Sequence, residues 1–314
     1  MKKYSLLLIT GAIVSSFFSI ASAQENSNPL PKIATHEHYR IGANLKAYFE
    51  VAARLGIQKS IFVPTGANPD NKGYEAHQRE LLKMQTKYPE KIIAFCTINE
   101  QDKKAYLKFR NCIKWGGKGL KLLGGHPGLY DEPLNSPNMM KVYKIAQKYK
   151  IPVLFHGSIL NIPETEGQIR DFLGKFPDVT FIQAHYCSAT TRGVQLEKCA
   201  KLLDDFPNLY IDGTLGGGLP GFIRQIQDPD ARKKVVGFIN NYQDRIVYSS
   251  DIILTKNRSE EELYTQMSCD SLVLEKSSFL CPAYDKEKEA IGLNLPEEIL
   301  KKIYTENAKR IYGF

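Results

Sequence analysis

The stretch from Pro152 to His185, PVLFHGSILNIPETEGQIRDFLGKFPDVTFIQAH, contains the unit that decides the fold. Residues 153–156 and 179–185 are apolar runs typical of buried β-strands, and residues 169–176 between them have helical spacing. A strand, a helix and a second strand in this order predict two parallel strands connected by a crossover helix. Both strands end on a histidine, so the same unit indicates where polar chemistry could begin.

The same alternation of strand and helix continues along the chain after Pro31. We predict strands at residues 32–35, 59–63, 92–98, 119–123, 153–156, 179–185, 209–212 and 245–250. We predict helical segments at residues 43–55, 74–88, 103–115, 139–150, 169–176, 191–206, 220–242, 260–267 and 296–312. Eight such α/β units favour a closed (β/α)8 barrel of the TIM type, and an open doubly wound sheet is the structural alternative.

Residues 1–23 have the features of a secretory signal peptide. Two lysines precede a largely apolar run, residues 6–20, and Ala21-Ser22-Ala23 fits a small-x-small cleavage site. We therefore expect a mature domain spanning residues 24–314 in the periplasm or outside the cell; an uncleaved anchor is the alternative. No cysteine follows the apolar run, so a lipoprotein anchor is not indicated. No later stretch is long and apolar enough to span a membrane.

Six cysteines follow the predicted signal peptide, and an exported protein can oxidise them. The sequence does not choose among the many pairings, although Cys269 and Cys281 are close neighbours in what reads as one long loop and form the most plausible pair. Buried free thiols are the alternative for the other four, Cys96, Cys112, Cys187 and Cys199. None of the six has a CxxC spacing, so we expect no cysteine metal site.

Composition places the chain among ordinary globular proteins, with 43% hydrophobic and 24% charged residues. The net charge of +8 comes from lysines spread along the chain, without the basic block that marks a nucleic-acid-binding arm. We therefore expect a small-molecule substrate and no nucleic-acid partner. A homo-oligomer remains open.

Four histidines and one aspartate stand at the predicted carboxyl ends of strands. His36 and His38 are two residues apart and share a face of an extended chain, whereas His156, His185 and Asp251 each end a later strand. In a barrel of parallel strands these ends meet at one mouth. Imidazoles and a carboxylate that converge there suit a divalent metal, most simply zinc.

Three further residues have open roles. Lys121 interrupts the apolar strand 119–123, where a buried lysine is costly unless it is paired; it could form a salt bridge, touch substrate or, if carbamylated, bridge two metals. Arg40 could hold a substrate carboxylate or lie on the surface. His126, in the loop after the fourth strand, is an exposed loop residue or a substrate contact.

Five segments taken together carry a family resemblance: Thr35-His36-Glu37-His38, Pro152-Val153-Leu154-Phe155-His156, Gln183-Ala184-His185, Tyr248-Ser249-Ser250-Asp251 and Asn307-Ala308-Lys309-Arg310-Ile311-Tyr312-Gly313. In this order, over nearly the whole mature chain, they resemble the amidohydrolase superfamily. The closest likeness is to its amidohydrolase-related branch, which includes metal-dependent hydrolases and the aminocarboxymuconate-semialdehyde type of decarboxylase. The chain departs from the pattern at Ala34, where aspartate is usual, and at Ser249, where glycine is usual; neither change removes a ligand.

The resemblance implies a distorted TIM barrel with one metal ion held by His36, His38, His156 and Asp251. It implies an acid–base or electrostatic role for His185. In two-metal relatives, the positions of His185 and of a carbamylated Lys121 would hold the second ion.

Metal-assisted hydrolysis is the chemistry that these residues favour. A bound metal lowers the pKa of water and polarises a carbonyl, Asp251 could take the proton, and His185 could stabilise the oxyanion. We therefore predict cleavage of a C–N or C–O bond in an amide, ester or lactone. Non-oxidative decarboxylation, or a metal-binding barrel without catalysis, are the alternatives; the sequence does not identify the substrate.

Overall fold

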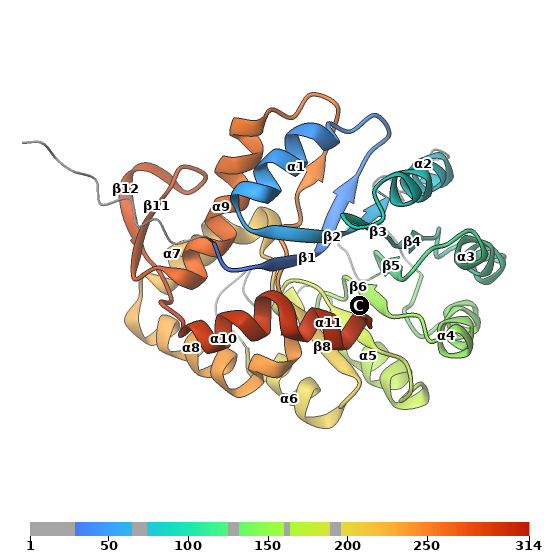
Figure 1. Cartoon of the computed structure of the whole chain (residues 1–314). Helices are drawn as coiled ribbons and strands as arrows, with labels where there is room; N and C mark the ends of the chain where they lie inside the picture. The colour runs from blue at the N-terminus through green and yellow to red at the C-terminus, as the bar shows by residue number, and fades with distance from the viewer. Residues whose placement is uncertain (1–28, 65–73, 125–131, 160–163, 189–195, 314) are drawn as a thin grey trace, which may run out of the picture.

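The computed structural model describes residues 29–64, 74–124, 132–159, 164–188 and 196–313 (Figure 1). The predicted signal peptide and His126 lie outside the described residues, so both predictions stay open.

Parallel strands form the centre of the molecule, in two sheets with the orders β10-β1-β2-β3 and β4-β5-β6-β7-β8-β9. These strands are β1 (Lys32–Tyr39), β2 (Ile57–Pro64), β3 (Ile92–Ala94), β4 (Cys96–Thr97), β5 (Leu120–Leu122), β6 (Val153–Phe155), β7 (Phe181–Gln183), β8 (Leu209–Asp212), β9 (Ile246–Val247) and β10 (Ile253–Leu254). Backbone hydrogen bonds join the sheets at both seams: Phe95 N donates to Phe62 O (2.9 Å), and Thr35 N donates to Tyr248 O (2.9 Å). The fold is a distorted (β/α)8 barrel, as predicted, with β3 and β4 forming one interrupted strand.

Helices surround the strands (Figure 1). They are α1 (Leu45–Arg54), α2 (Tyr74–Lys87), α3 (Ala105–Lys114), α4 (Pro137–Tyr149), α5 (Glu164–Lys175), α6 (Glu197–Asp205), α7 (Leu219–Ile226), α8 (Pro229–Tyr242), α9 (Glu260–Glu275), α10 (Glu297–Lys301) and α11 (Asn307–Tyr312). Local signals explain several starts: Ser136 caps α4 ahead of Pro137, and Ser259 with Glu262 forms a capping box on α9. No described helix is long and apolar enough to cross a membrane.

The C-terminal helical segment covers the end of the barrel where the strands begin. Thr305 Oγ1 donates to Pro31 O (2.7 Å), just before β1, and Asn307 Nδ2 donates to Ile246 O (2.7 Å), at the start of β9. The opposite end, where the strands finish, is therefore the open mouth.

Alternating side chains fill the barrel. Ile61 and Val63 of β2 pack inside with Leu154 and Ile182, whereas Phe62 between them faces the surrounding helices. The same alternation turns Lys121 inward, because Leu120 and Leu122 on either side of it pack toward the helices. The interior is thus a packed core, with one lysine placed in it beneath the mouth.

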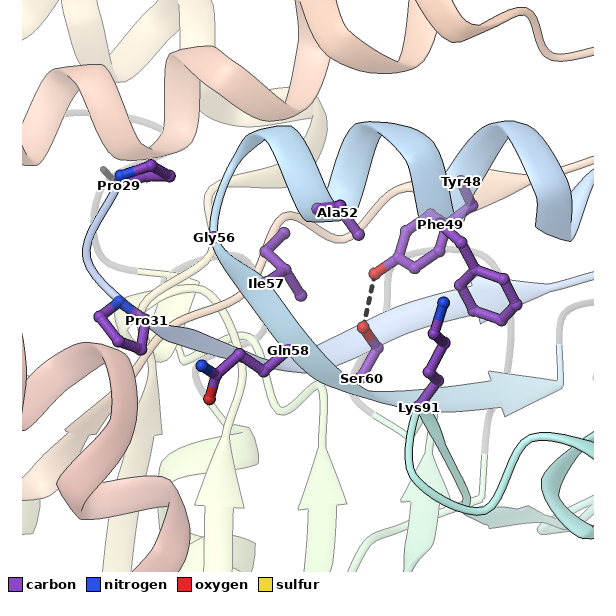
Figure 2. A pocket seen from close by; sticks show the side chains of 11 residues that line it. Pro29, Pro31, Tyr48, Phe49, Ala52, Gly56, Ile57, Gln58, Ser60 and Lys91 are labelled. Carbon is purple, nitrogen blue, oxygen red and sulfur yellow. Dashed lines mark hydrogen bonds between the residues drawn. The ribbon is translucent and has the colours of Figure 1, made fainter. Parts of the chain in front are cut away.

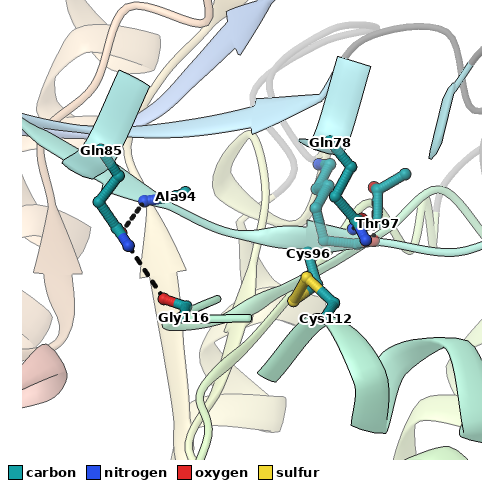
Figure 3. The surroundings of a disulfide bond; sticks show 8 residues. Gln78, Gln85, Ala94, Cys96, Thr97, Cys112 and Gly116 are labelled. Carbon is teal, nitrogen blue, oxygen red and sulfur yellow. Dashed lines mark hydrogen bonds between the residues drawn. A yellow bond between two sulfur atoms is a disulfide. The ribbon is translucent and has the colours of Figure 1, made fainter. Parts of the chain in front are cut away.

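Three disulfides connect the six cysteines. They are Cys96–Cys112 between β4 and α3, Cys187–Cys199 between the turn after β7 and α6, and Cys269–Cys281 between α9 and the next strand. The predicted pair Cys269–Cys281 is confirmed, although Cys269 lies in a helix and not in a loop. The free-thiol alternative for the other four cysteines is wrong. Figure 3 shows the Cys96–Cys112 bond near Gln78 and Gln85 of α2. A Cβ on Gly117 would lie 2.3 Å from Cys96 Sγ, so only glycine fits at this position.

Several features were not predicted. Helix α9 continues to Glu275 instead of ending near residue 267, and an antiparallel hairpin follows it, made of β11 (Ser278–Cys281) and β12 (Asp285–Ile291). A cavity of about 430 Å³ also lies between α1 and the starts of β1 and β2, around the Tyr48–Ser60 hydrogen bond (Figure 2). None of the four candidate histidines lines this cavity, so it lies away from the predicted site.

Candidate metal centre

His36, His38 and Asp251 come together at the mouth, as their strand-end positions predicted. Asp251 Oδ1 lies 3.5 Å from His36 Nε2 and 3.0 Å from His38 Nε2. Among the described residues, these three form a group whose ligand atoms all lie within 4.8 Å of one another. Three donor atoms at this spacing could hold one divalent ion.

A break in strand pairing gives His36 its place. The β1–β2 register shifts between Ala34 and Glu37, and the intervening backbone pairs instead with the segment after β9: Asp251 N donates to His36 O (3.0 Å). Ser249 Oγ accepts from His36 N (2.7 Å) and donates to His36 O (2.6 Å). Such irregularities often occur where a strand must aim a side chain at a functional site.

Glu37 points away from the two histidines and braces the segment that carries Asp251. Its buried carboxyl group accepts hydrogen bonds from Ser250 N (3.2 Å), Ser250 Oγ (2.9 Å) and Ile252 N (2.9 Å), and Ser249 Oγ lies 3.3 Å from its Oε1. Burial raises the pKa of Glu37 to about 8, against these hydrogen bonds, which lower it. Ser249 and Ser250 thus contact Glu37 and connect it to the segment that carries Asp251. The departure from Gly-Ser noted in the sequence therefore has a structural reason.

Asp212, at the end of β8, sets the tautomer of His36. Its Oδ2 lies 2.6 Å from His36 Nδ1, and its Oδ1 accepts from Thr214 N (3.0 Å). Burial raises the pKa of Asp212 to about 7 and lowers that of His36 well below its ordinary value, so this histidine is held neutral. A proton on Nδ1 leaves the Nε2 lone pair free for a metal, an arrangement found behind many histidine ligands.

Asp251 is held in an unusual backbone conformation beside a glycine. Its φ is +53°, and a Cβ added to Gly216 would lie 2.2 Å from Asp251 Oδ2. Burial raises the pKa of Asp251, but the attraction of the His36, His38 and His185 rings in their protonated forms, together with the His38 hydrogen bond, outweighs it and holds that pKa well below its ordinary value. The carboxylate therefore stays charged, as a metal ligand must.

His185 and His156 lie beside this group. The His185 ring centroid is 5.7 Å from that of His36 and 5.0 Å from that of His156. His185 Nδ1 lies 3.3 Å from Thr214 O, and since a carbonyl only accepts, this nitrogen must donate. His156 does not belong to the three-residue group described above, so the structure brings together three of the four predicted ligands.

Lys121 is buried inside the barrel below the mouth, as predicted, and acidic groups offset its charge. Burial lowers its pKa to about 8, while Asp251, Asp212 and Glu100 act to raise it. Glu100 is fixed by Leu123 N (2.6 Å) and Gly124 N (2.9 Å), and burial raises its pKa to about 7. The buried position of Lys121 is thus as predicted, and its role stays a prediction.

Sequence reasoning missed Glu37, Asp212 and Glu100. Asp212 could have been predicted, because this residue ends a predicted strand just as Asp251 does. Glu37 stood inside the quoted His-x-His motif, but only the fold reveals that its side chain meets Ser250.

The donor set fits a divalent metal. His36 Nε2 is buried and has no hydrogen-bond partner among the described residues, yet it faces a charged carboxylate oxygen and a second imidazole nitrogen. Buried polar atoms usually have partners, and closely spaced lone pairs repel each other unless a cation or proton lies between them. The three residues therefore form a candidate metal centre.

Comparison with known proteins agrees with this picture. A family model described as amidohydrolase matches residues 35–314. None of the curated proteins matches the sequence significantly.

Among solved structures, the chain is similar to a probable 2-pyrone-4,6-dicarboxylic acid hydrolase from Acinetobacter baumannii (TM-score 0.61, 14% identity, covering 91% of this chain and 100% of that one). It is similar to a 2,6-dihydroxybenzoate decarboxylase from Rhizobium (0.55, 17%, covering 90% and 98%). It is also similar to a 5-carboxyvanillate decarboxylase from Novosphingobium aromaticivorans with bound manganese (0.54, 12%, covering 90% and 96%). At these identities the structural likeness shows the fold alone. The family match over nearly the whole described chain shows that this protein belongs to the amidohydrolase family.

Proposed function

We propose that this protein is a metal-dependent hydrolase that cleaves a C–N or C–O bond in a small amide, ester or lactone. The observation that carries the proposal is the group of His36, His38 and Asp251, in which Asp212 leaves the His36 Nε2 lone pair free. A divalent ion held there would activate water and polarise the substrate carbonyl. Zinc is the proposed ion, because it prefers histidine and carboxylate ligands in small numbers.

The protein's own residues would then handle protons and charge. Asp251 is a carboxylate that can accept a proton from the attacking water and return it to the leaving group. His185, when it carries a proton on both nitrogens, donates from Nδ1 to Thr214 O and can donate from Nε2 to a developing oxyanion. The Lys121 ammonium adds positive potential below the same site.

A cavity next to Asp251 offers room for the rest of a small substrate. It has a volume of about 420 Å³, and it is lined in part by Gly216, Arg258 and Gln266. Gly216 also lies against Asp251, although His36, His38 and Asp251 themselves do not line the cavity. Arg258 donates to Gln266 Oε1 (2.7 Å), while its buried Nε has no hydrogen-bond partner among the described residues. We propose that substrate extends into this cavity.

Non-oxidative decarboxylation is the second candidate. Two of the structural relatives are decarboxylases, and an acidic group beside a metal could also protonate an unsaturated carbon.

A screen of purified, metal-loaded protein against amides, esters, lactones and unsaturated or aromatic acids tests both candidate functions. Release of a carboxylic acid from a neutral substrate supports hydrolysis, and release of CO₂ supports the second candidate. Metal binding without turnover of any class would leave only a binding role.

We expect one tightly held metal ion per chain. Metal analysis of the purified protein measures this, and His185→Ala serves as the matched variant. If His185 acts on substrate, its loss leaves the metal content unchanged; His156→Ala, which removes the proposed fourth ligand, lowers it. Two ions in the wild type, with one lost in His185→Ala, would instead place a second metal at His185 and a carbamylated Lys121.

We further propose that the protein is exported and cleaved after Ala23. The order of charged, apolar and small residues in the first 23 positions supports this, as does the pairing of all six cysteines in disulfides. N-terminal sequencing of protein from the cell envelope should begin at Gln24. A mature protein that still begins at Met1 would refute the proposal.

A further inference from the structure

Three consecutive residues after β7 have left-handed backbone conformations. The φ angles are +60° at His185, +49° at Tyr186 and +59° at Cys187. None of them is glycine, and an L-residue in this region brings its Cβ close to the following carbonyl oxygen. Only six non-glycine residues in the described part of the chain have positive φ, and three of them stand here. The surrounding structure must therefore hold this turn in place.

The turn changes the direction in which His185 points. Ile182 and Ala184 pack inside the barrel, and Phe181 packs toward the helices. If the strand continued in this alternation, the next side chain after Ala184 would also face the helices. The His185 ring instead lies beside the His36 and His156 rings. The left-handed turn is thus what brings His185 to the candidate metal centre.

Each residue of the turn is fixed to a different part of the fold. His185 Nδ1 donates to Thr214 O, and the buried Tyr186 ring packs edge-on against Phe238 of α8 (6.3 Å between centroids). Cys187 is bonded to Cys199 of α6, with 5.8 Å between the Cα atoms. The disulfide is the only covalent restraint among these contacts, and it acts two residues from His185.

We propose that the Cys187–Cys199 disulfide is a positioning element for His185. Intact, it keeps the turn left-handed and the imidazole at the mouth; without it, the backbone relaxes toward an extended form and the imidazole leaves the site. The metal ligands do not depend on it, because His36, His38 and Asp251 belong to β1 and to the segment braced by Glu37. This inference rests on the proposed role of His185 in catalysis.

The double variant Cys187→Ser/Cys199→Ser tests this proposal, and Cys269→Ser/Cys281→Ser is its matched control. Both disulfides have a sequence separation of 12, so their removal frees loops of equal length in the unfolded chain. We expect both variants to keep the wild-type metal content and to lose a similar amount of thermal stability. The first should also lose kcat by about 10²-fold, as expected for removal of one donor that stabilises an oxyanion, and the control should stay within about twofold.

Two further measurements separate positioning from a general loss of structure. Adding His185→Ala to Cys187→Ser/Cys199→Ser should reduce kcat no further, because the histidine is already displaced. In the wild type, ring ¹⁵N shifts of labelled histidines should show the His185 proton on Nδ1, assigned by its disappearance in His185→Ala. This signature should be lost in Cys187→Ser/Cys199→Ser and kept in the control.

Several outcomes would overturn the proposal. It fails if both disulfide variants lose kcat in proportion to the decrease in their melting temperatures. It also fails if adding His185→Ala to Cys187→Ser/Cys199→Ser lowers kcat by the same factor as His185→Ala alone does in the wild type. It also fails if the ¹⁵N signature of His185 is unchanged without the bond. The nuclear magnetic resonance measurement needs no turnover. It therefore decides the positioning of His185 even if the proposed hydrolase activity is absent.

Discussion

Asp251→Asn should lower turnover by about 10²–10⁴-fold, the range typical for loss of a general acid–base group, and should weaken metal binding as well. The amide has the same size, but it carries no charge and cannot accept the proton. The backbone contact from Asp251 N to His36 O does not involve the side chain, so the fold should persist. Steady-state kinetics and metal analysis measure the two effects separately.

Asp230→Asn is the matched control, because Asp230 is exposed in the first turn of α8 and lies in no candidate site. It should leave both quantities within about twofold of the wild type, in keeping with the small effects usual for surface substitutions. If Asp251→Asn proved as active as Asp230→Asn, the active site would have to be elsewhere.

Asp212→Asn should reduce metal affinity by about 10–100-fold, the usual effect of removing a partner behind a metal-binding histidine. Asp212 Oδ1 accepts from Thr214 N, so the amide oxygen of asparagine takes that place and its NH₂ group turns toward His36. His36 Nδ1 then has to accept, and its proton moves to Nε2, the atom that should bind the metal. Competition titration with a coloured chelator gives the affinity.

His36→Ala sets the lower limit for that titration, because it removes the nitrogen altogether. Asp212→Asn should fall between it and the wild type and keep a wild-type circular dichroism spectrum. Unchanged affinity in Asp212→Asn would mean that His36 binds no metal through Nε2.

The barrel was predictable because its strands are buried on both faces and therefore read as continuous apolar runs, each followed by a helical pattern. Helix α9 was cut short in the prediction because it is covered on several sides, with the five consecutive residues from Met267 to Ser271 all buried. It therefore has no single apolar face to mark its length. The β11–β12 hairpin was missed because β12 is mostly exposed and reads DKEKEAI, without apolar alternation.

The grouping of the candidate metal centre was predictable for a different reason: His36, His38 and Asp251 stand at strand ends, and the order of the strands alone brings those ends together. Residues that orient these three side chains were not predictable in this way. Asp212 and Glu37 gain their roles from partners far away in the chain, 176 residues for the Asp212 contact to His36 and 213 for the Glu37 contact to Ser250. Neither partner is visible without the fold.

The connectivity of the three disulfides has a consequence for biosynthesis. Each cysteine is bonded to the next one along the chain, at separations of 16, 12 and 12 residues. A polypeptide that enters an oxidising compartment N-terminus first exposes both partners of one bond before the following pair arrives. Vectorial oxidation would therefore give the native connectivity directly, and such a chain would depend on oxidant alone, without an isomerase to correct mispaired cysteines.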